Sequence, residues 1–176
     1  MTAPIVLLLA GGLLAATDPV AAPEPRVESS DREAGAVLRD GYRRSPTLRA
    51  LVDQIDASSW FVFVQQGACP AGSDTVGCLL HTVGRYHGAP YLRIRITARG
   101  RNRDHVIATL GHELQHAWEA ISDPSVVDSG SLSAMFRRIG FESERAGSTI
   151  VFETAEADRV GAVVLRELDA DNVQRR

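Results

Sequence analysis

Two histidines four residues apart constrain this 176-residue chain more than any other feature. His112 and His116 belong to the run HELQH, inside a segment from about Arg103 to Ile121 whose apolar residues recur with helical spacing. Residues four apart on a helix lie one above the other, so both imidazoles project from one side at a separation that one zinc ion bridges. Glu113 is turned by about 100° from His112 and can reach a water on such an ion without ligating the ion itself.

A catalytic zinc site needs a third protein ligand and an open position for water. The best source is a helix predicted over about residues 152–168, whose apolar residues again recur with helical spacing. Glu153 lies four residues before Ala157 and points toward the core, whereas Glu156 lies at the edge of the apolar face. Glu153 is therefore favoured as the third ligand, Glu156 is the alternative, and Asp128, in a predicted loop, ranks third.

The residues directly after His116 exclude one class of zinc protein. Glu119 and Ser122 occupy the positions where the extended metzincin motif carries Gly and His. Glu119 stands one turn after His116, and two interpretations of it remain open. It is either a hydrogen-bonding partner of a metal ligand or a solvent-exposed charge on the helix.

This combination of motifs resembles the gluzincin metallopeptidases, in which an HExxH helix is completed by a glutamate from a following helix. The resemblance covers roughly residues 91–168. Many gluzincins place Ala or Ala-Asp three and four positions after the ligand Glu, and here Glu156 and Ala157 occupy those positions. The stretch HELQHAWEA with the later FETAEADRVG is also similar to a group of small exported bacterial proteins of unassigned function.

The resemblance implies a zinc metallopeptidase, a hydrolase in which His112, His116 and Glu153 hold Zn²⁺. We expect it to hydrolyse peptide bonds as a metalloendopeptidase does, with a water activated by the metal. Glu113 is then the catalytic general base, which takes the proton of the water and delivers it to the departing amine. The alternative function is a non-catalytic zinc- or peptide-binding envelope protein that keeps the same fold.

The strand ahead of the metal-binding helix suggests where a peptide or protein substrate binds. In zincins this strand commonly receives the substrate as an added β-strand, and the segment Tyr91–Thr97 occupies that position here. Its residues alternate strictly, as in a half-buried strand. The resemblance thus implies substrate contacts for Tyr91, Arg93 and Arg95, with the two arginines favouring acidic side chains.

The order of the predicted elements favours a small α+β domain of zincin-like type. Strands come first and helices follow, so we expect an antiparallel or mixed sheet of about three to four strands packed on the active-site helix and two following helices. Residues 140–148 are predicted to form a loop. The predicted strands are 60–64, 79–82 and 91–97, and the predicted helices are about 45–55, 103–121, 131–139 and 152–168.

The amino-terminal region predicts export. An apolar run over residues 5–16 has the length of a signal-peptide core and is too short for a comfortable membrane span. We expect residues 1–22 to be a signal peptide, 23–30 a flexible leader, and 31–176 the metallopeptidase domain. The predicted location is periplasmic or extracellular, with no stable membrane span after cleavage.

Cysteine usage and charge agree with that prediction. Cys69 and Cys78 flank a turn-rich segment and are expected to form a disulfide, as suits an oxidising compartment. The net charge of −3 gives no electrostatic footprint for nucleic acid. All 19 basic residues are arginine, which excludes Schiff-base chemistry and a Walker-type lysine.

Overall fold

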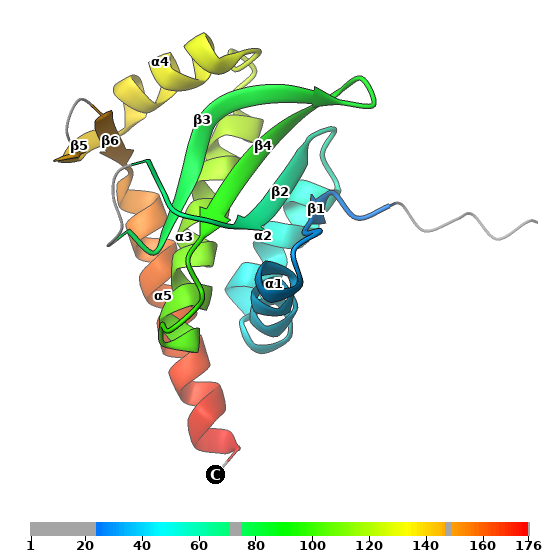
Figure 1. Cartoon of the computed structure of the whole chain (residues 1–176), viewed down its shortest axis with the longest axis vertical. Helices are drawn as coiled ribbons and strands as arrows, with labels where there is room; N and C mark the ends of the chain where they lie inside the picture. Colours follow the sequence, from blue (N-terminus) through cyan, green and yellow to red (C-terminus); the bar gives the residue numbers. More distant parts are fainter. Residues whose placement is uncertain (1–23, 71–74, 147–148, 176) are drawn as a thin grey trace, which may run out of the picture.

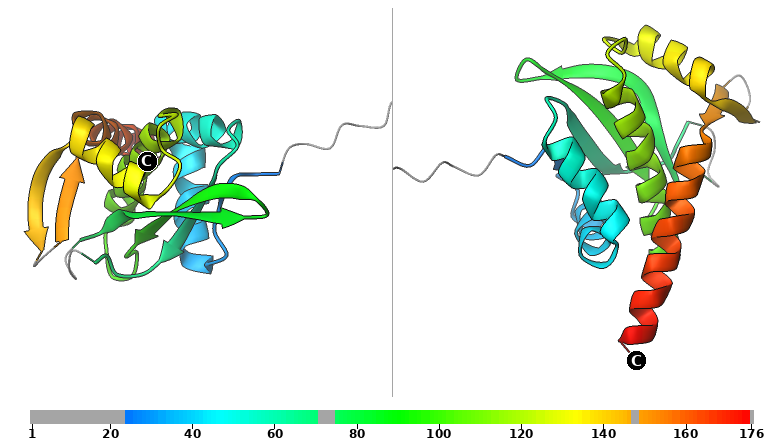
Figure 2. Two further views of the ribbon diagram at one scale, coloured as in Figure 1. Left: turned by 90° about the horizontal axis from the view of Figure 1, so that it is seen from above. Right: turned by 180° about the vertical axis from the view of Figure 1, so that it is seen from behind.

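A mixed four-stranded sheet carries the helices on one of its sides (Figures 1 and 2). The computed structural model describes residues 24–70, 75–146 and 149–175. Strands β1, β2 and β4 run parallel to one another, and β3 pairs with β4 in the antiparallel sense. The predicted α+β class is confirmed. In spatial order the strands are β1 (Val27–Glu28), β2 (Phe61–Gln66), β4 (Ala89–Ile96) and β3 (Gly77–Tyr86).

Each of the five helices in the described residues begins after a polar side chain that accepts a backbone N–H from the first turn. These N-caps are Asp31, Ser45, Asn102, Asp128 and Thr154. The helices are α1 (Arg32–Arg44), α2 (Pro46–Asp56), α3 (Arg103–Ser122), α4 (Ser129–Ile139) and α5 (Ala155–Gln174). A separate hairpin of β5 (Phe141–Ala146) and β6 (Thr149–Glu153) connects α4 to α5.

Helix α3 forms the centre of the core, because the sheet, α1 and α2, and α5 all pack against it (Figure 1). Leu92, Ile94 and Ile96 are fully buried on the helix-covered face of the sheet. Leu110 and Leu114 of α3 belong to the same buried cluster. A helix covered on several sides does not have a single apolar face opposite a polar one. The eleven buried residues of α3 accordingly include the polar residues Glu113, Gln115 and His116.

A glycine allows α3 and α5 to approach closely. A Cβ atom on Gly111 of α3 would lie 2.8 Å from Val164 Cγ2 of α5. On the other side of this contact, a Cβ on Gly161 of α5 would lie 3.3 Å from His112 Cβ. The close packing of these two helices therefore depends on the absence of a side chain at Gly111 and Gly161. This packing fixes α5 next to His112.

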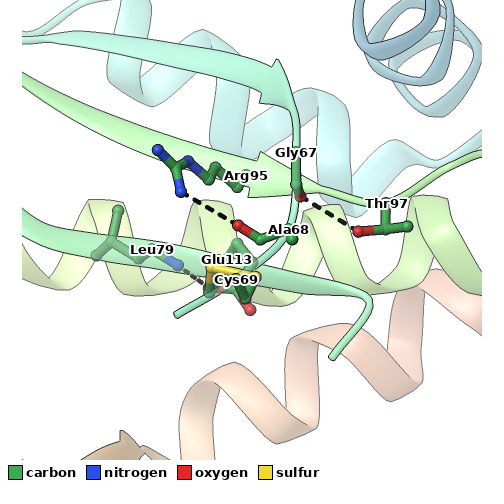
Figure 3. The surroundings of a disulfide bond; sticks show 8 residues. Gly67, Ala68, Cys69, Leu79, Arg95, Thr97 and Glu113 are labelled. Carbon is green, nitrogen blue, oxygen red and sulfur yellow. Dashed lines mark hydrogen bonds between the residues drawn. A yellow bond between two sulfur atoms is a disulfide. The ribbon is translucent and has the colours of Figure 1, made fainter. Parts of the chain in front are cut away.

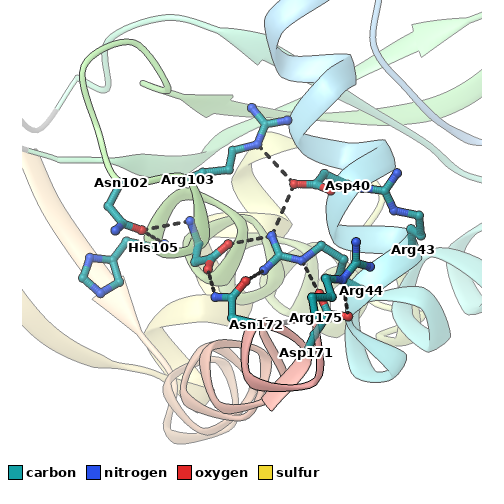
Figure 4. A network of polar contacts seen from close by, with 10 residues as sticks. Asp40, Arg43, Arg44, Asn102, Arg103, His105, Asp171, Asn172 and Arg175 are labelled. Carbon is teal, nitrogen blue, oxygen red and sulfur yellow. Dashed lines mark hydrogen bonds and ion pairs between the residues drawn. The ribbon is translucent and has the colours of Figure 1, made fainter. Parts of the chain in front are cut away.

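A polar network joins three helices near the amino-terminal end of α3 (Figure 4). Arg44 of α1, with 9% of its side chain exposed, donates to Asp104 of α3 at 2.7 Å and to Asp171 of α5 at 2.8 Å. Asn172 accepts from Arg44 and donates to Asp104. The hydrogen bond from Arg44 lowers the pKa of the Asp104 carboxyl, so this nearly buried guanidinium is matched by ionised partners.

The amino-terminal boundaries predicted from sequence need correction. The expected leader, residues 23–30, is not a leader throughout, because β1 pairs with β2 and Val27 is 5% exposed. Asp56 fixes this strand by accepting from the N–H groups of Arg26 and Val27. A strand of two residues is too short to give a periodic pattern. The predicted signal peptide, 1–22, lies outside the described residues.

Three further segments also differ from the prediction. The expected loop 140–148 contains β5, whose sequence FESERA lacks the apolar alternation by which strands are recognised. The last helix begins at Ala155 rather than near Phe152, because Thr154 caps it. Helix α1 was not predicted, since three of its four buried residues, Ala34, Gly35 and Gly41, are too small to give a clear apolar pattern.

The predicted disulfide between Cys69 and Cys78 is present and links the segment after β2 to the start of β3 (Figure 3). The next residue of β3 after Cys78, Leu79, donates its backbone N–H to Glu113 of α3, and this bond links β3 to the HELQH run (Figure 3). Within the described part of the chain, none of the helices has the length and apolar character that crossing a membrane requires.

The contact between Gly111 and Val164 predicts the effect of one added methyl group. We expect Gly111→Ala to destabilise the fold by about 1–3 kcal/mol, because overpacking outweighs the better helix propensity of alanine. Chemical denaturation measures the change. The double variant Gly111→Ala, Val164→Ala should lose less stability than the sum of the two single variants, and strict additivity would contradict the proposed steric contact.

Candidate metal centre

Three donor atoms converge between α3 and the end of the hairpin. His112 Nε2 lies 2.7 Å from Glu153 Oε2, and His116 Nε2 lies 3.2 Å from the same oxygen. The three residues each offer a ligand atom within 4.8 Å of the others. The helical spacing of the two histidines, read from sequence, thus places both imidazoles on one side of α3, as expected.

Glu153 reaches this point from an element that the sequence did not predict. It is the last residue of β6, directly before the N-cap of α5, and not a residue of the helix. The two alternative ligands point elsewhere. Glu156 is half exposed and pairs with Arg159 at 2.5 Å, while Asp128 is the exposed N-cap of α4. Of the three acidic candidates, the structure brings only Glu153 to the histidines.

The chemistry of the donor set fits a zinc ion. Two imidazole nitrogens and one carboxylate oxygen are the ligands of many catalytic zinc sites, which leave a fourth position open. The Nδ1 atom of each ligand histidine also faces a carboxylate, Asp158 at 3.6 Å from His112 and Glu119 at 3.1 Å from His116. The hydrogen bond to Glu119 keeps the proton of His116 on Nδ1, which leaves its Nε2 lone pair free for a metal, whereas Asp158 lies beyond hydrogen-bond distance of His112.

The three residues strongly perturb one another in the metal-free protein. Burial favours the neutral form of Glu153, but hydrogen bonds from His112 and His116 outweigh it and lower the pKa of Glu153 to about 2. Burial would lower the pKa of His116, yet the carboxylates of Glu119 and Glu153 raise it to about 10. The pKa of His112 is raised too, because Glu153 and Glu113 overcome its desolvation. Without an ion, the cluster is therefore a set of partly buried ion pairs.

Glu113 occupies a different position from the three donors. It is 7% exposed, and its Oε2 accepts a hydrogen bond of 2.6 Å from the backbone N–H of Leu79 in β3 (Figure 3). Burial raises the pKa of Glu113, and the neighbouring histidines only partly oppose this shift. A carboxylate with raised proton affinity, on the same helix as the two ligand histidines, has the properties of a general base.

Strand β4 does not have the position expected for a substrate-binding strand. It pairs with β2 on one side and β3 on the other, so it has no free edge, and the predicted pairing of a peptide with Tyr91–Thr97 is wrong. Tyr91, Arg93 and Arg95 alternate with the buried residues of β4 and lie on the sheet face away from α3. They are therefore separated from the metal-ligand candidates by the sheet itself. Strand order is a non-local property that the alternation within one strand does not contain.

Strand β3 is one of the two edge strands of the sheet, and it carries a histidine that the sequence pattern did not single out. His81 stacks on Phe136 of α4 with ring centroids 5.0 Å apart. His116 meets the same Phe136 ring edge-on, with centroids 5.3 Å apart. Burial lowers the pKa of His81, with a smaller effect from the charge of His116. The predicted strand 79–82 already contained His81, but no local pattern indicates its contact with α4, because that contact joins segments far apart in the chain.

Comparisons with family models, with curated proteins and with solved structures find no match to this chain. Fold and site together define an α+β domain with a candidate metal centre of two imidazoles and one carboxylate.

The ion pairs of the metal-free cluster predict how stability depends on pH. Glu153 has an ordinary pKa of 4.5, so its stabilising effect is complete above that pH and is lost as the pH falls toward 2. His116 has an ordinary pKa of 6.5, so its effect is complete below that pH and is lost as the pH rises through about 10. The cluster should stabilise the zinc-free fold most between these two ordinary values.

Thermal unfolding of zinc-stripped protein between pH 6.5 and 10 measures this effect. The midpoint should fall with pH more steeply in the wild type than in Glu153→Gln, because His116 loses a charged partner in the variant. Saturating zinc should reverse the sign, since a metal requires neutral imidazoles. Parallel curves for the two zinc-stripped proteins would refute the assignment of the pH dependence to this cluster.

Proposed function

We propose that this protein is a zinc-dependent peptidase that cleaves peptide bonds in the manner of a metalloendopeptidase. The observation that carries the proposal is the convergence of His112, His116 and Glu153 on one point. The helix that carries the two histidines also carries the buried Glu113. Two imidazoles and a carboxylate alone would suit a structural ion as well. The buried carboxylate of Glu113, with its raised pKa, favours catalysis.

The residues of the chain divide the proposed reaction among them. Zinc, held by His112, His116 and Glu153, would supply a Lewis acid that polarises the scissile carbonyl and makes water more acidic. Glu113 accepts a proton from the attacking water, whose oxygen forms the new bond to the carbonyl carbon. The same carboxylic acid then donates that proton to the amide nitrogen as the C–N bond breaks. The N–H of Leu79 orients the carboxylate throughout these transfers.

We place the peptide along the outer edge of β3. Two features support this choice over β4. First, β3 ends the sheet, and an edge strand can accept a further strand. Second, β3 runs against the metal-binding helix, since a Cβ on Gly77 would lie 2.7 Å from Thr109 Cγ2 and 3.4 Å from Glu113 Cγ. The N–H groups of Leu79 and Val83 already bond to Glu113 and Ser129, so pairing would use other backbone groups of this strand.

The same proposal includes export to the periplasm or the extracellular space. Its support is the disulfide between Cys69 and Cys78, because such bonds persist in oxidising compartments and are rare in the cytosol.

Metal content tests the first step of the proposal. The purified full chain should hold about one zinc ion, as measured by elemental analysis. Glu153→Ala should lose most of the bound zinc, because it removes a ligand. Glu156→Ala is the matched control and should keep it, since its carboxylate pairs with Arg159 at the surface. Equal zinc content in the two variants would contradict the assignment of the third ligand.

Glu113→Gln tests catalysis separately from metal binding. The variant keeps the size of the side chain but cannot accept a proton, so the rate of peptide hydrolysis should fall by about 10²–10⁴-fold. Zinc content should remain that of the wild type. Mass spectrometry of a peptide library measures cleavage. A zinc-loaded wild type that cleaves nothing would instead favour a non-catalytic zinc- or peptide-binding protein.

A further inference from the structure

Glu119 contacts two parts of the candidate metal centre at once. Its Oε2 lies 3.1 Å from Nδ1 of His116, and its Oε1 accepts a hydrogen bond of 2.7 Å from the hydroxyl of Thr154. The side chain is 12% exposed, so Glu119 is not the solvated helix charge that the sequence left open. Among the described residues, these two groups are its polar side-chain partners, and neither is a lysine or an arginine.

Thr154 links this carboxylate to the third ligand. It directly follows Glu153, is 4% exposed, and caps α5 by accepting from the N–H of Ala157 at 3.2 Å. Its hydroxyl therefore has two fixed partners, Glu119 on α3 and the first turn of α5. Since Glu153 and Thr154 share a peptide bond, the contact with Glu119 also determines how far Glu153 stands from the histidines.

We propose that Glu119 is a positioning residue of the metal centre, which holds His116 directly and Glu153 through Thr154. This inference rests on the metal-binding part of the proposed function and not on peptide hydrolysis. A carboxylate at Nδ1 of His116 keeps Nε2 directed at the ion, and the bond to Thr154 sets the carboxylate of Glu153 against the same point. One side chain thus orders two of the three ligands, which lie on different elements of the chain.

The other histidine lacks an equivalent arrangement. Asp158 lies 3.6 Å from Nδ1 of His112, and 58% of its side chain is exposed. An exposed partner at this distance orders an imidazole less than a buried, hydrogen-bonded one does. The centre should therefore depend on Glu119 more than on Asp158, although both are carboxylates beside a ligand histidine.

Zinc affinity of the full chain, measured by competition with a chromophoric chelator, tests the proposal. Glu119→Gln and Thr154→Val should each weaken zinc binding by about 10–100-fold, the usual effect of removing such a partner. Thr154→Ser keeps the hydroxyl and should restore binding to within about threefold of the wild type. Asp158→Asn should have a smaller effect than Glu119→Gln. Glu156→Gln, the same chemical change on an exposed carboxylate, is the control and should leave the affinity unchanged.

A second readout separates positioning from a loss of folding. The visible absorption of the Co²⁺-substituted protein reports ligand geometry, and it should change in Glu119→Gln and Thr154→Val but not in Thr154→Ser or Glu156→Gln. If Glu119→Gln fails to fold, the comparison of Thr154→Val with Thr154→Ser still decides the matter.

Three results would overturn the proposal. Zinc affinity of folded Glu119→Gln within threefold of the wild type, or equal affinities of the two Thr154 variants, would overturn it and leave the proposed function intact. A wild-type chain that binds no zinc would overturn both.

Discussion

The burial of α3 between the sheet and α5 is the constraint on which the rest of the structure depends. A helix enclosed in this way must satisfy every polar side chain from a neighbouring element, because unpaired buried groups are costly. His112 and His116 turn to Glu153 of β6, and Glu113 turns to the backbone of β3. The polar groups of the central helix thereby join it to the sheet and to the hairpin, and the candidate metal centre is the place where these links meet.

Local patterns predicted the central helix and the pair of histidines, because both depend on residues within a few turns of one another. The choice of Glu153 over Glu156 agrees with the geometry, although the reasoning assumed that both belong to a helix. Glu153 instead ends a strand, and a threonine cap sets its position relative to α5. Capping depends on one side chain and leaves no periodic signal. The apolar pattern therefore predicted Glu153 as the ligand but not the strand on which it lies.

Features that depend on the arrangement of distant segments could not be predicted in this way. The alternation of β4 correctly separated its buried residues from Arg93 and Arg95, yet it said nothing of which strands flank it. The sheet begins with a parallel strand of two residues, held by Asp56 from the end of α2. Such contacts join residues about thirty positions apart and are decided by packing, not by propensity.

The distance along the chain between the ligands has an energetic consequence. Glu153 follows His116 by 37 residues, with α4 and the β5–β6 hairpin between them. An unfolded chain would rarely hold the three donors together, so an ion would bind the native state far better than the denatured one. By mass action the free energy of such binding adds to the stability of the whole domain, and the concentration of free ion becomes one of the variables that set its unfolding equilibrium.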